Sequence, residues 1–203
     1  MCHNRGVKDY SQHGESTILY DLFDRIITPA SYTAVEFGAD DGWHGSNIRM
    51  FMEDGWTGIQ WDTETWITAE NVNVLFAREV PEDVDLVSID IDGNDYWVWE
   101  ALDWEPSVVI IEYNSAFPHG RSVTIAYDPD HQWRRDAHYG ASMDALVALG
   151  EKKGYVLVAE VAHANLIFVH DRWRSRVTPM DPSRVVLPFE RFGSPGCVGW
   201  VEL

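Results

Sequence analysis

The densest group of potentially reactive side chains lies in the segment Ser88-Ile-Asp-Ile-Asp-Gly-Asn-Asp95. It carries the carboxylates of Asp90, Asp92 and Asp95 and the amide of Asn94 at the end of an apolar run. Like charges this close repel one another unless something neutralises them. A hard divalent cation such as Mg²⁺ takes such oxygen ligands. The segment therefore indicates a metal site; the alternative is that Asp95 caps the following helix and Asp90 accepts backbone hydrogen bonds.

A second pair of oxygen-bearing side chains, Glu112 and Asn114, repeats the two-residue spacing of Asp90 and Asp92. Residues two apart in a strand point to the same face of the sheet. If the two segments are neighbouring strands, the four side chains meet at one edge. We therefore predict that Asp92, Glu112 and Asn114 bind the metal, and that Asp90 supports them as a candidate catalytic residue.

A third acidic group follows the first predicted strand, in Glu36-Phe-Gly-Ala-Asp-Asp-Gly42. A glycine here lets the backbone turn tightly and approach a ligand. Asp62 ends the next apolar run, where a carboxylate can accept both hydroxyls of a ribose. We predict that Glu36, Gly38, Asp40 and Asp62 bind a cofactor. The alternatives are an ordinary strand-to-helix turn for the first group and a helix cap or an exposed acid for Asp62.

Histidines and tryptophans in the predicted loops are further candidates. His44, His119 and His138 fall at the functional edge, where an imidazole can act as a general base, and we select His119 and His138. An ordinary exposed loop histidine is the alternative for each. The tryptophans expected on the ligand side are Trp43, Trp61, Trp66 and Trp133.

The elements that must position these residues alternate along the chain. Apolar periodicity predicts helices over 15–27, 47–53, 69–79 and 95–102 and another from Ser142. It predicts strands over 32–38, 56–62, 84–90 and 107–112, then a hairpin of 155–161 and 165–170. Near-continuous apolar strands are typical of parallel sheets covered on both faces. We expect an α/β, Rossmann-like fold: a mostly parallel sheet with one antiparallel edge from the C-terminal hairpin, and a site beyond the carboxyl ends of the strands.

The chain is long enough for one domain and too short for two of ordinary size. We expect an α/β domain over 1–170 and a tail over 171–203 packed on the same domain. The long segment 114–141 lacks clear periodicity and is expected to be a lid. Aromatic residues of the tail offer a contact for a homodimer.

Composition restricts the partners and the compartment. The formal charge of −18 disfavours binding to phosphate backbones, so nucleic acid is not expected as a partner. No apolar run approaches the roughly 18 residues of a membrane span, and the N-terminus lacks the apolar region of a secretory signal. Cys2 and Cys197 are expected to be free thiols. We expect a cytoplasmic protein that acts on a small molecule.

Four segments resemble the FkbM-type and related class I S-adenosylmethionine-dependent methyltransferases, and the likeness extends over residues 10–170. These segments are Tyr10-Ser-Gln-His-Gly-Glu15, Val35-Glu-Phe-Gly-Ala39, Ser88-Ile-Asp-Ile-Asp-Gly-Asn-Asp-Tyr-Trp97 and Ile111-Glu-Tyr-Asn114. In the lid, Tyr127-Asp-Pro-Asp130 and Tyr139-Gly-Ala-Ser142 add to it. The resemblance implies S-adenosylmethionine as cofactor and methyl transfer to a hydroxyl of a sugar or natural product. In the related macrolide-sugar enzymes Mg²⁺ holds that hydroxyl.

Two departures from the family pattern keep an alternative open. Asp40 stands where the family has glycine, and its carboxylate would repel the carboxylate of the cofactor. The segment between Asp62 and Leu86 is too short for a complete further strand with its helices, so one unit is reduced to residues 63–67. The alternative function is a divalent-metal-dependent hydrolase or lyase, or a binding protein, that has lost the cofactor.

Overall fold

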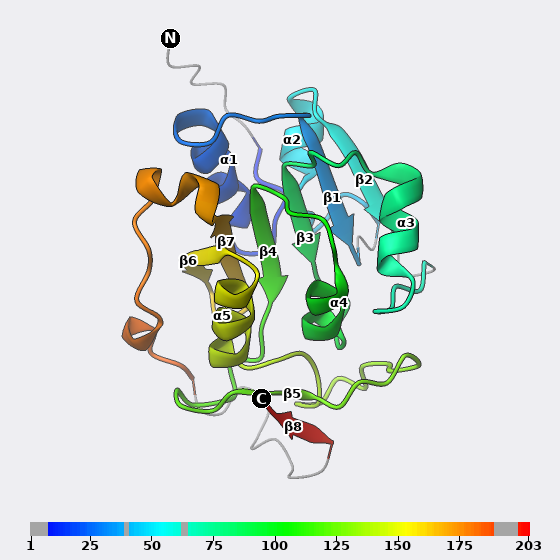
Figure 1. Cartoon of the computed structure of the whole chain (residues 1–203), viewed down its shortest axis with the longest axis vertical. Coiled ribbons are helices and arrows are strands. Elements are labelled where there is room, and N and C mark those ends of the chain that lie inside the picture. The colour runs from blue at the N-terminus through cyan, green and yellow to red at the C-terminus, as the bar shows by residue number, and fades with distance from the viewer. Residues whose placement is uncertain (1–7, 39–40, 62–64, 189–198) are drawn as a thin grey trace.

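The computed structural model describes residues 8–38, 41–61, 65–188 and 199–203 (Figure 1). Its α-helices are α1 (Glu15–Arg25), α2 (Arg49–Glu53), α3 (Val72–Glu79), α4 (Asp95–Ala101) and α5 (Met143–Lys152). Its strands are β1 (Thr33–Phe37), β2 (Thr57–Trp61), β3 (Leu86–Ile89), β4 (Val108–Glu112), β5 (Val123–Ile125), β6 (Tyr155–Val161), β7 (Asn165–His170) and β8 (Trp200–Glu202). Two 3-10 helices, η1 (Asp171–Arg176) and η2 (Pro182–Arg184), follow β7.

Six strands form the central sheet in the order β2-β1-β3-β4-β7-β6. β2, β1, β3 and β4 are parallel, and β7 is antiparallel to both β4 and β6. The C-terminal hairpin therefore gives the sheet its antiparallel edge, as predicted, with β7 on the inner side and β6 outermost. The physical reason is burial: β7 is buried over nearly its whole length and takes the interior position, whereas the middle of β6 is partly exposed and stays at the edge.

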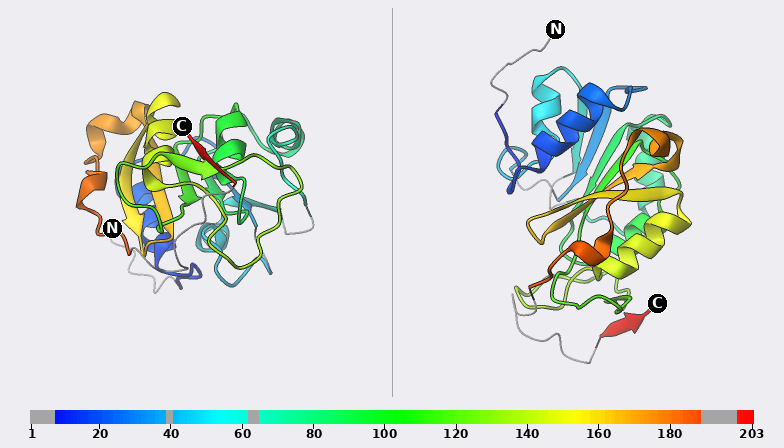
Figure 2. Two further views of the ribbon diagram at one scale, coloured as in Figure 1. Left: turned by 90° about the horizontal axis from the view of Figure 1, so that it is seen from below. Right: turned by 90° about the vertical axis from the view of Figure 1, so that its left-hand side faces the viewer.

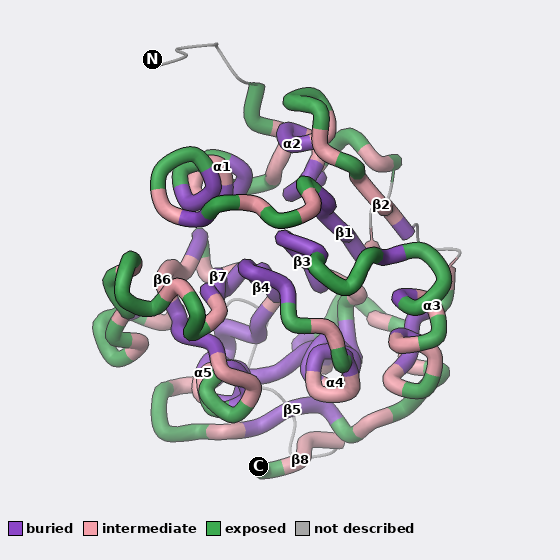
Figure 3. The backbone as a smooth tube through the Cα atoms, turned by 45° about the horizontal axis from the view of Figure 1, so that its top comes forward, coloured by how far each residue is buried: buried purple, intermediate pink, exposed green. Residues whose placement is uncertain are grey.

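Alternating side chains of the parallel strands supply two cores, one on each face of the sheet. Val35, Val87 and Val109 pack on one face with residues of α3, α4 and α5. Ala34, Leu86 and Val108 pack on the other with residues of α1 and α2. Figure 2 shows the helices on both sides of the sheet, and Figure 3 shows that β1, β3 and β4 are buried. The expected α/β, Rossmann-like architecture is confirmed.

Some ends of the elements differ from prediction because local side chains intervene. α3 begins at Val72 rather than Ala69, since the Asn71 side chain accepts from Thr68 N at 2.8 Å and donates to Trp66 O, forming a turn. β3 ends at Ile89, before the acidic segment.

The lid, residues 114–141, contains a strand that sequence periodicity did not reveal. β5 pairs antiparallel with β8, at the end of the chain, in a small second sheet below the main one (Figure 1). The tail therefore carries regular structure, contrary to the absence of any clear element in its sequence. A side chain of the tail also packs against the lid, because the rings of Phe117 and Trp200 lie 4.5 Å apart.

Within the described ranges, every helix is too short or too polar to cross a membrane.

Candidate active site at the carboxyl ends of the parallel strands

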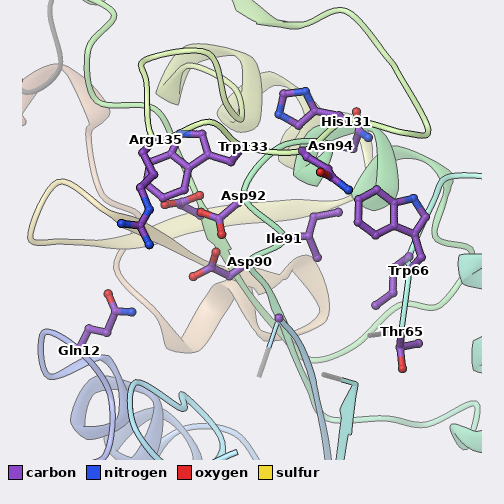
Figure 4. Close-up of a pocket in the computed structure, with 14 residues that line it drawn as sticks. Gln12, Thr65, Trp66, Asp90, Ile91, Asp92, Asn94, His131, Trp133 and Arg135 are labelled. Carbon is purple, nitrogen blue, oxygen red and sulfur yellow. The ribbon is translucent and has the colours of Figure 1, made fainter. Parts of the chain in front are cut away.

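A cavity of about 620 Å³ opens where β1, β3 and β4 end. Gly38 follows β1, Asp90 follows β3 and Glu112 ends β4, and all three line the cavity. Figure 4 labels Asp90 among the lining residues. The lid supplies another wall, including His131 and Trp133. The carboxyl ends of the parallel strands lie at this edge of the sheet, and open α/β folds bind ligands there.

Three carboxylates meet on the floor of the cavity. One ligand oxygen from each of Asp90, Asp92 and Glu112 lies within 4.8 Å of the others. The sequence placed Asp90 and Asp92 on one face of a continued strand, but β3 has already ended and Asp92 has a left-handed backbone with φ 55°. A turn, rather than strand alternation, brings the two carboxylates together.

Asp95 shapes this turn. Its buried carboxylate accepts hydrogen bonds from Ile91 N and Gly93 N, both at 2.9 Å. Burial raises the pKa of Asp95 to about 6, although these two bonds oppose the shift. Asp95 is also the first residue of α4, so the proposed capping role is replaced by one of holding the turn that presents Asp90 and Asp92.

The negative charges of the clustered carboxylates are unfavourable unless a positive charge or bound protons neutralise them. Burial raises the pKa of Asp90 well above its usual range, and repulsion from Asp95 and Asp92 adds to the shift. Burial also raises the pKa of Asp92. Neutralisation by protons or by a bound cation would relieve the repulsion.

Asn94 adds a buried side-chain oxygen to the cavity. Its Nδ2 donates to Asp128 O at 2.7 Å, while its Oδ1 has no hydrogen-bond partner among the described residues. Asn94 lines the cavity, yet its side chain is only 5% exposed. Leaving a buried acceptor unsatisfied costs about 1–3 kcal/mol, so this oxygen is suited to a ligand in the cavity.

His131 is the described histidine that lines the cavity, and we did not select it from the sequence. Its ring is hydrogen-bonded to the backbone of Asp92, and its Nε2 has no partner within the described ranges. Gly93 makes room for the ring, since a Cβ there would lie 2.3 Å from Cδ2 of His131. Burial lowers the pKa of His131, which favours the neutral imidazole. Its position, directly after the segment Tyr127–Asp130 that resembles the family's lid, was the available signal.

The two histidines selected from the sequence lie elsewhere. His119 Nε2 is 2.9 Å from Val185 O, and His138 Nε2 is 3.1 Å from Gly199 O. Neither is among the described residues that line the cavity. Both bind the tail, which the sequence did not place beside the lid.

Asn114 is a structural residue rather than a member of the acidic cluster. Its Nδ2 donates to Ala137 O and Tyr139 O, both at 2.9 Å, and its Oδ1 accepts from Ala116 N at 3.0 Å. The amide is thus fully occupied by lid backbone, and only 1% of the residue is exposed. The structure does not bring Asn114 to the three carboxylates.

The predicted cofactor residues have different positions. Glu36 is buried and accepts from Ser46 Oγ at 2.6 Å, Asn47 N at 2.6 Å and Gln60 Nε2 at 2.9 Å, so it orders the start of α2. Burial raises its pKa despite these bonds. Gly38 lines the cavity, whereas Glu36 is not among its described lining residues. Asp40 and Asp62 lie outside the described residues.

The tryptophans expected near the ligand divide into two groups. Trp66 and Trp133 line the cavity. Trp61 is buried in the core, stacked on Phe37 at 5.4 Å, and Trp43 lines a separate surface hollow.

Comparisons with known proteins return no matching family model and no matching curated protein. The N-terminal domain of EvdMO1, determined in the presence of SAH and D-fucose, is similar in structure with a TM-score of 0.39 and 10% identity over 84% of this chain and 85% of that one. The pyocyanin biosynthetic protein PhzM has a TM-score of 0.38 and 11% identity, over 76% of this chain and 55% of its own. An S-adenosylmethionine-dependent methyltransferase from Clostridium acetobutylicum has a TM-score of 0.39 and 10% identity, over 82% and 94%. With TM-scores below 0.5, these likenesses establish nothing about the activity or the cofactor of this chain.

The chain has a Rossmann-like α/β fold, a mostly parallel sheet with helices packed on both faces. Its own strand order supports this assignment, with an antiparallel strand inserted beside the last strand of a helix-covered parallel sheet.

Proposed function

We propose that the protein is an S-adenosylmethionine-dependent methyltransferase that acts on a hydroxyl of a sugar or natural-product-like small molecule, assisted by a divalent cation. The observation that carries the proposal is the meeting of Asp90, Asp92 and Glu112 in one cavity that also reaches Gly38 at the end of β1.

The donor set fits a hard cation such as Mg²⁺. Such ions bind one or two carboxylates and complete their shell with water and substrate oxygen. Asp90, Asp92 and Glu112 supply oxygens within 4.8 Å of one another, and Asn94 Oδ1 is a further buried oxygen in the same cavity. Asn114 is left out of the proposed ligand set because lid backbone occupies its amide.

The cavity also fits a cofactor in size and position. Its volume of about 620 Å³ is within the roughly 300–1,000 Å³ of small-molecule sites. It extends from Gly38, after β1, to Trp66 and Ile67, which follow β2. Glu36 would order the turn and would not touch the cofactor. Contacts from Asp40 and Asp62 stay predictions.

The protein side chains would have separate tasks in the reaction. S-adenosylmethionine supplies the methyl group, and the cation supplies positive charge that makes a hydroxyl more acidic. Asp90, Asp92 and Glu112 would hold the cation, and Trp66 and Trp133 would exclude water. We assign acceptance of the hydroxyl proton to the imidazole of His131 rather than to that of His119 or His138, because His131 lines the cavity.

The test is calorimetric titration with S-adenosylmethionine, with and without MgCl₂, combined with thermal unfolding. We expect cofactor binding, and a rise in Tm with MgCl₂ that Asp92→Asn and Glu112→Gln abolish. Asp83→Asn and Glu82→Gln, two exposed acids in the turn before β3, are the matched controls. Absence of binding heat at millimolar S-adenosylmethionine would refute the methyltransferase proposal.

One observation favours the alternative, a metal-dependent hydrolase or lyase or a binding protein. The Glu36 carboxylate is committed to Ser46, Asn47 and Gln60 and leaves the cofactor fewer partners from β1. In that case the metal-linked rise in Tm persists and Asp62→Ala leaves the activity unchanged. A large loss on changing Asp62 favours the methyltransferase.

A further inference from the structure

The order of the strands gives the cavity two distinct ends. Along β2-β1-β3-β4, Trp66 lies after β2, at one end, and Glu112 lies on β4, at the other. Figure 4 shows Trp66 and Thr65 on one side, Asp90 and Asp92 in the middle, and Arg135 with Gln12 on the opposite side. If the cofactor extends from Gly38 toward Trp66, as proposed above, the substrate occupies the end beside Arg135.

Arg135 is the one arginine or lysine among the described residues that line the cavity. Its guanidinium makes no ion pair or hydrogen bond within the described ranges, although carboxylates line the same cavity. The loop on either side is held in place, since Trp133 Nε1 donates to Asp136 O at 2.8 Å and His138 N donates to Asp136 Oδ1 at 3.0 Å. Within the described part of the chain, the Arg135 guanidinium therefore keeps its hydrogen-bond donors available for a ligand at the substrate end.

We infer that the substrate carries an anionic group, a carboxylate or a phosphate, that Arg135 binds while a hydroxyl of the same molecule faces Asp90, Asp92 and Glu112. This inference deepens the proposed function and rests on it. A protein of net charge −18 repels anions at long range, so an anionic substrate needs a local cation. Guanidinium forms paired hydrogen bonds with either group, and Trp133 on the same loop offers an apolar face for the rest of the molecule.

The test compares matched probes on the Mg²⁺-saturated protein by calorimetry at constant ionic strength. D-glucuronate and D-glucose 6-phosphate are the anionic probes, one for each source of charge, and D-glucose is the neutral one. Arg135→Gln removes the positive charge. Arg135→Lys keeps the charge but lacks the paired N–H donors of a guanidinium. Arg134→Gln is the control, because Arg134 is adjacent but is not among the described lining residues.

We expect the anionic probes to bind more tightly than D-glucose, and Arg135→Gln to weaken an anionic probe about tenfold, the loss of one charge-assisted interaction, without affecting D-glucose. Arg135→Lys should lose less, and Arg134→Gln should match wild type. Anionic probes that bind no better than D-glucose, or an equal loss in Arg134→Gln, would overturn the inference. A loss of S-adenosylhomocysteine affinity in Arg135→Gln would assign the arginine to the cofactor's carboxylate and also overturn it. Failure of the proposed function itself is separable, because it shows in the wild-type titrations with cofactor and MgCl₂.

Discussion

The carbonyl oxygen of Asp90 occupies the space that a side chain at Gly38 would need. A Cβ at Gly38 would lie 1.9 Å from this oxygen, and Gly38 has φ 70°. The turn after β1 and the turn after β3 are thus in backbone contact, directly beside the three carboxylates.

Gly38→Ala should therefore lower the free energy of unfolding by about 3 kcal/mol, because it combines a backbone clash with an unfavourable φ. Urea denaturation measures the change. Gly55→Ala is the control: Gly55 also has a positive φ, 94°, but a Cβ there meets nothing within 4 Å. It should cost about 1 kcal/mol, from backbone conformation alone. Equal losses in the two variants would contradict the contact between the turns.

Asn114→Asp separates a structural role from metal binding. The variant loses the donors to Ala137 O and Tyr139 O, so we expect a loss of about 2–4 kcal/mol in unfolding free energy and faster proteolysis of the lid. A metal ligand would respond in the opposite way, because a carboxylate binds Mg²⁺ at least as well as an amide. A stable Asn114→Asp variant with tighter Mg²⁺ binding would return Asn114 to the ligand set.

Asp95 should make stability depend on pH. Burial raises its pKa from 3.8 to about 6 in the folded protein, so the folded state holds this proton more tightly than the unfolded state. The contribution is fully present below about pH 4 and is lost as the pH rises through about 6, at most roughly 3 kcal/mol.

Chemical denaturation of the metal-free protein between pH 4 and pH 7 measures this dependence. Asp95→Asn should have a lower free energy of unfolding than wild type at pH 4, and this free energy should fall less between pH 4 and pH 7. Asp83→Asn, at an exposed position, should follow the wild-type profile. An unchanged pH profile in Asp95→Asn would refute the assignment.

The last strand should hold the lid closed. Trp200 packs on Phe117 at 4.5 Å and on His138 at 5.3 Å, and β8 pairs with β5. We expect Trp200→Ala to increase hydrogen exchange across residues 114–141 and to weaken substrate binding, with little effect on the main sheet. Val186→Ala, at a side chain that is 85% exposed, is the control. Unchanged exchange in the lid of Trp200→Ala would show that β8 is dispensable there.

The sequence predicted the sheet and its acidic edge well because both depend on local patterns. Apolar runs of strand length between amphipathic helices indicated β1, β3 and β4, and acids at the ends of these runs had to reach one edge of a parallel sheet. Asp90, Asp92 and Glu112 met for this reason. The resemblance to methyltransferases rested on the same segments.

Residues of the lid and the tail could not be placed in this way, because their contacts are non-local. His131 lines the cavity, whereas His119 and His138 do not. The rings of His119 and His138 instead hydrogen-bond to tail carbonyls, those of Val185 and Gly199. Asn114 has the spacing of a ligand, but two lid carbonyls far along the chain take its amide.

The sequence by itself thus determined the order of the main-sheet strands and their helices along the chain and the gathering of carboxylates at one edge, because side-chain periodicity and strand direction are properties of the local chain. Only the tertiary structure decided that β7 lies inside the sheet and that Asn94, His131 and Arg135 line the same cavity as the carboxylates. These outcomes depend on which distant segment satisfies each polar group when it is buried, and no local pattern encodes that choice.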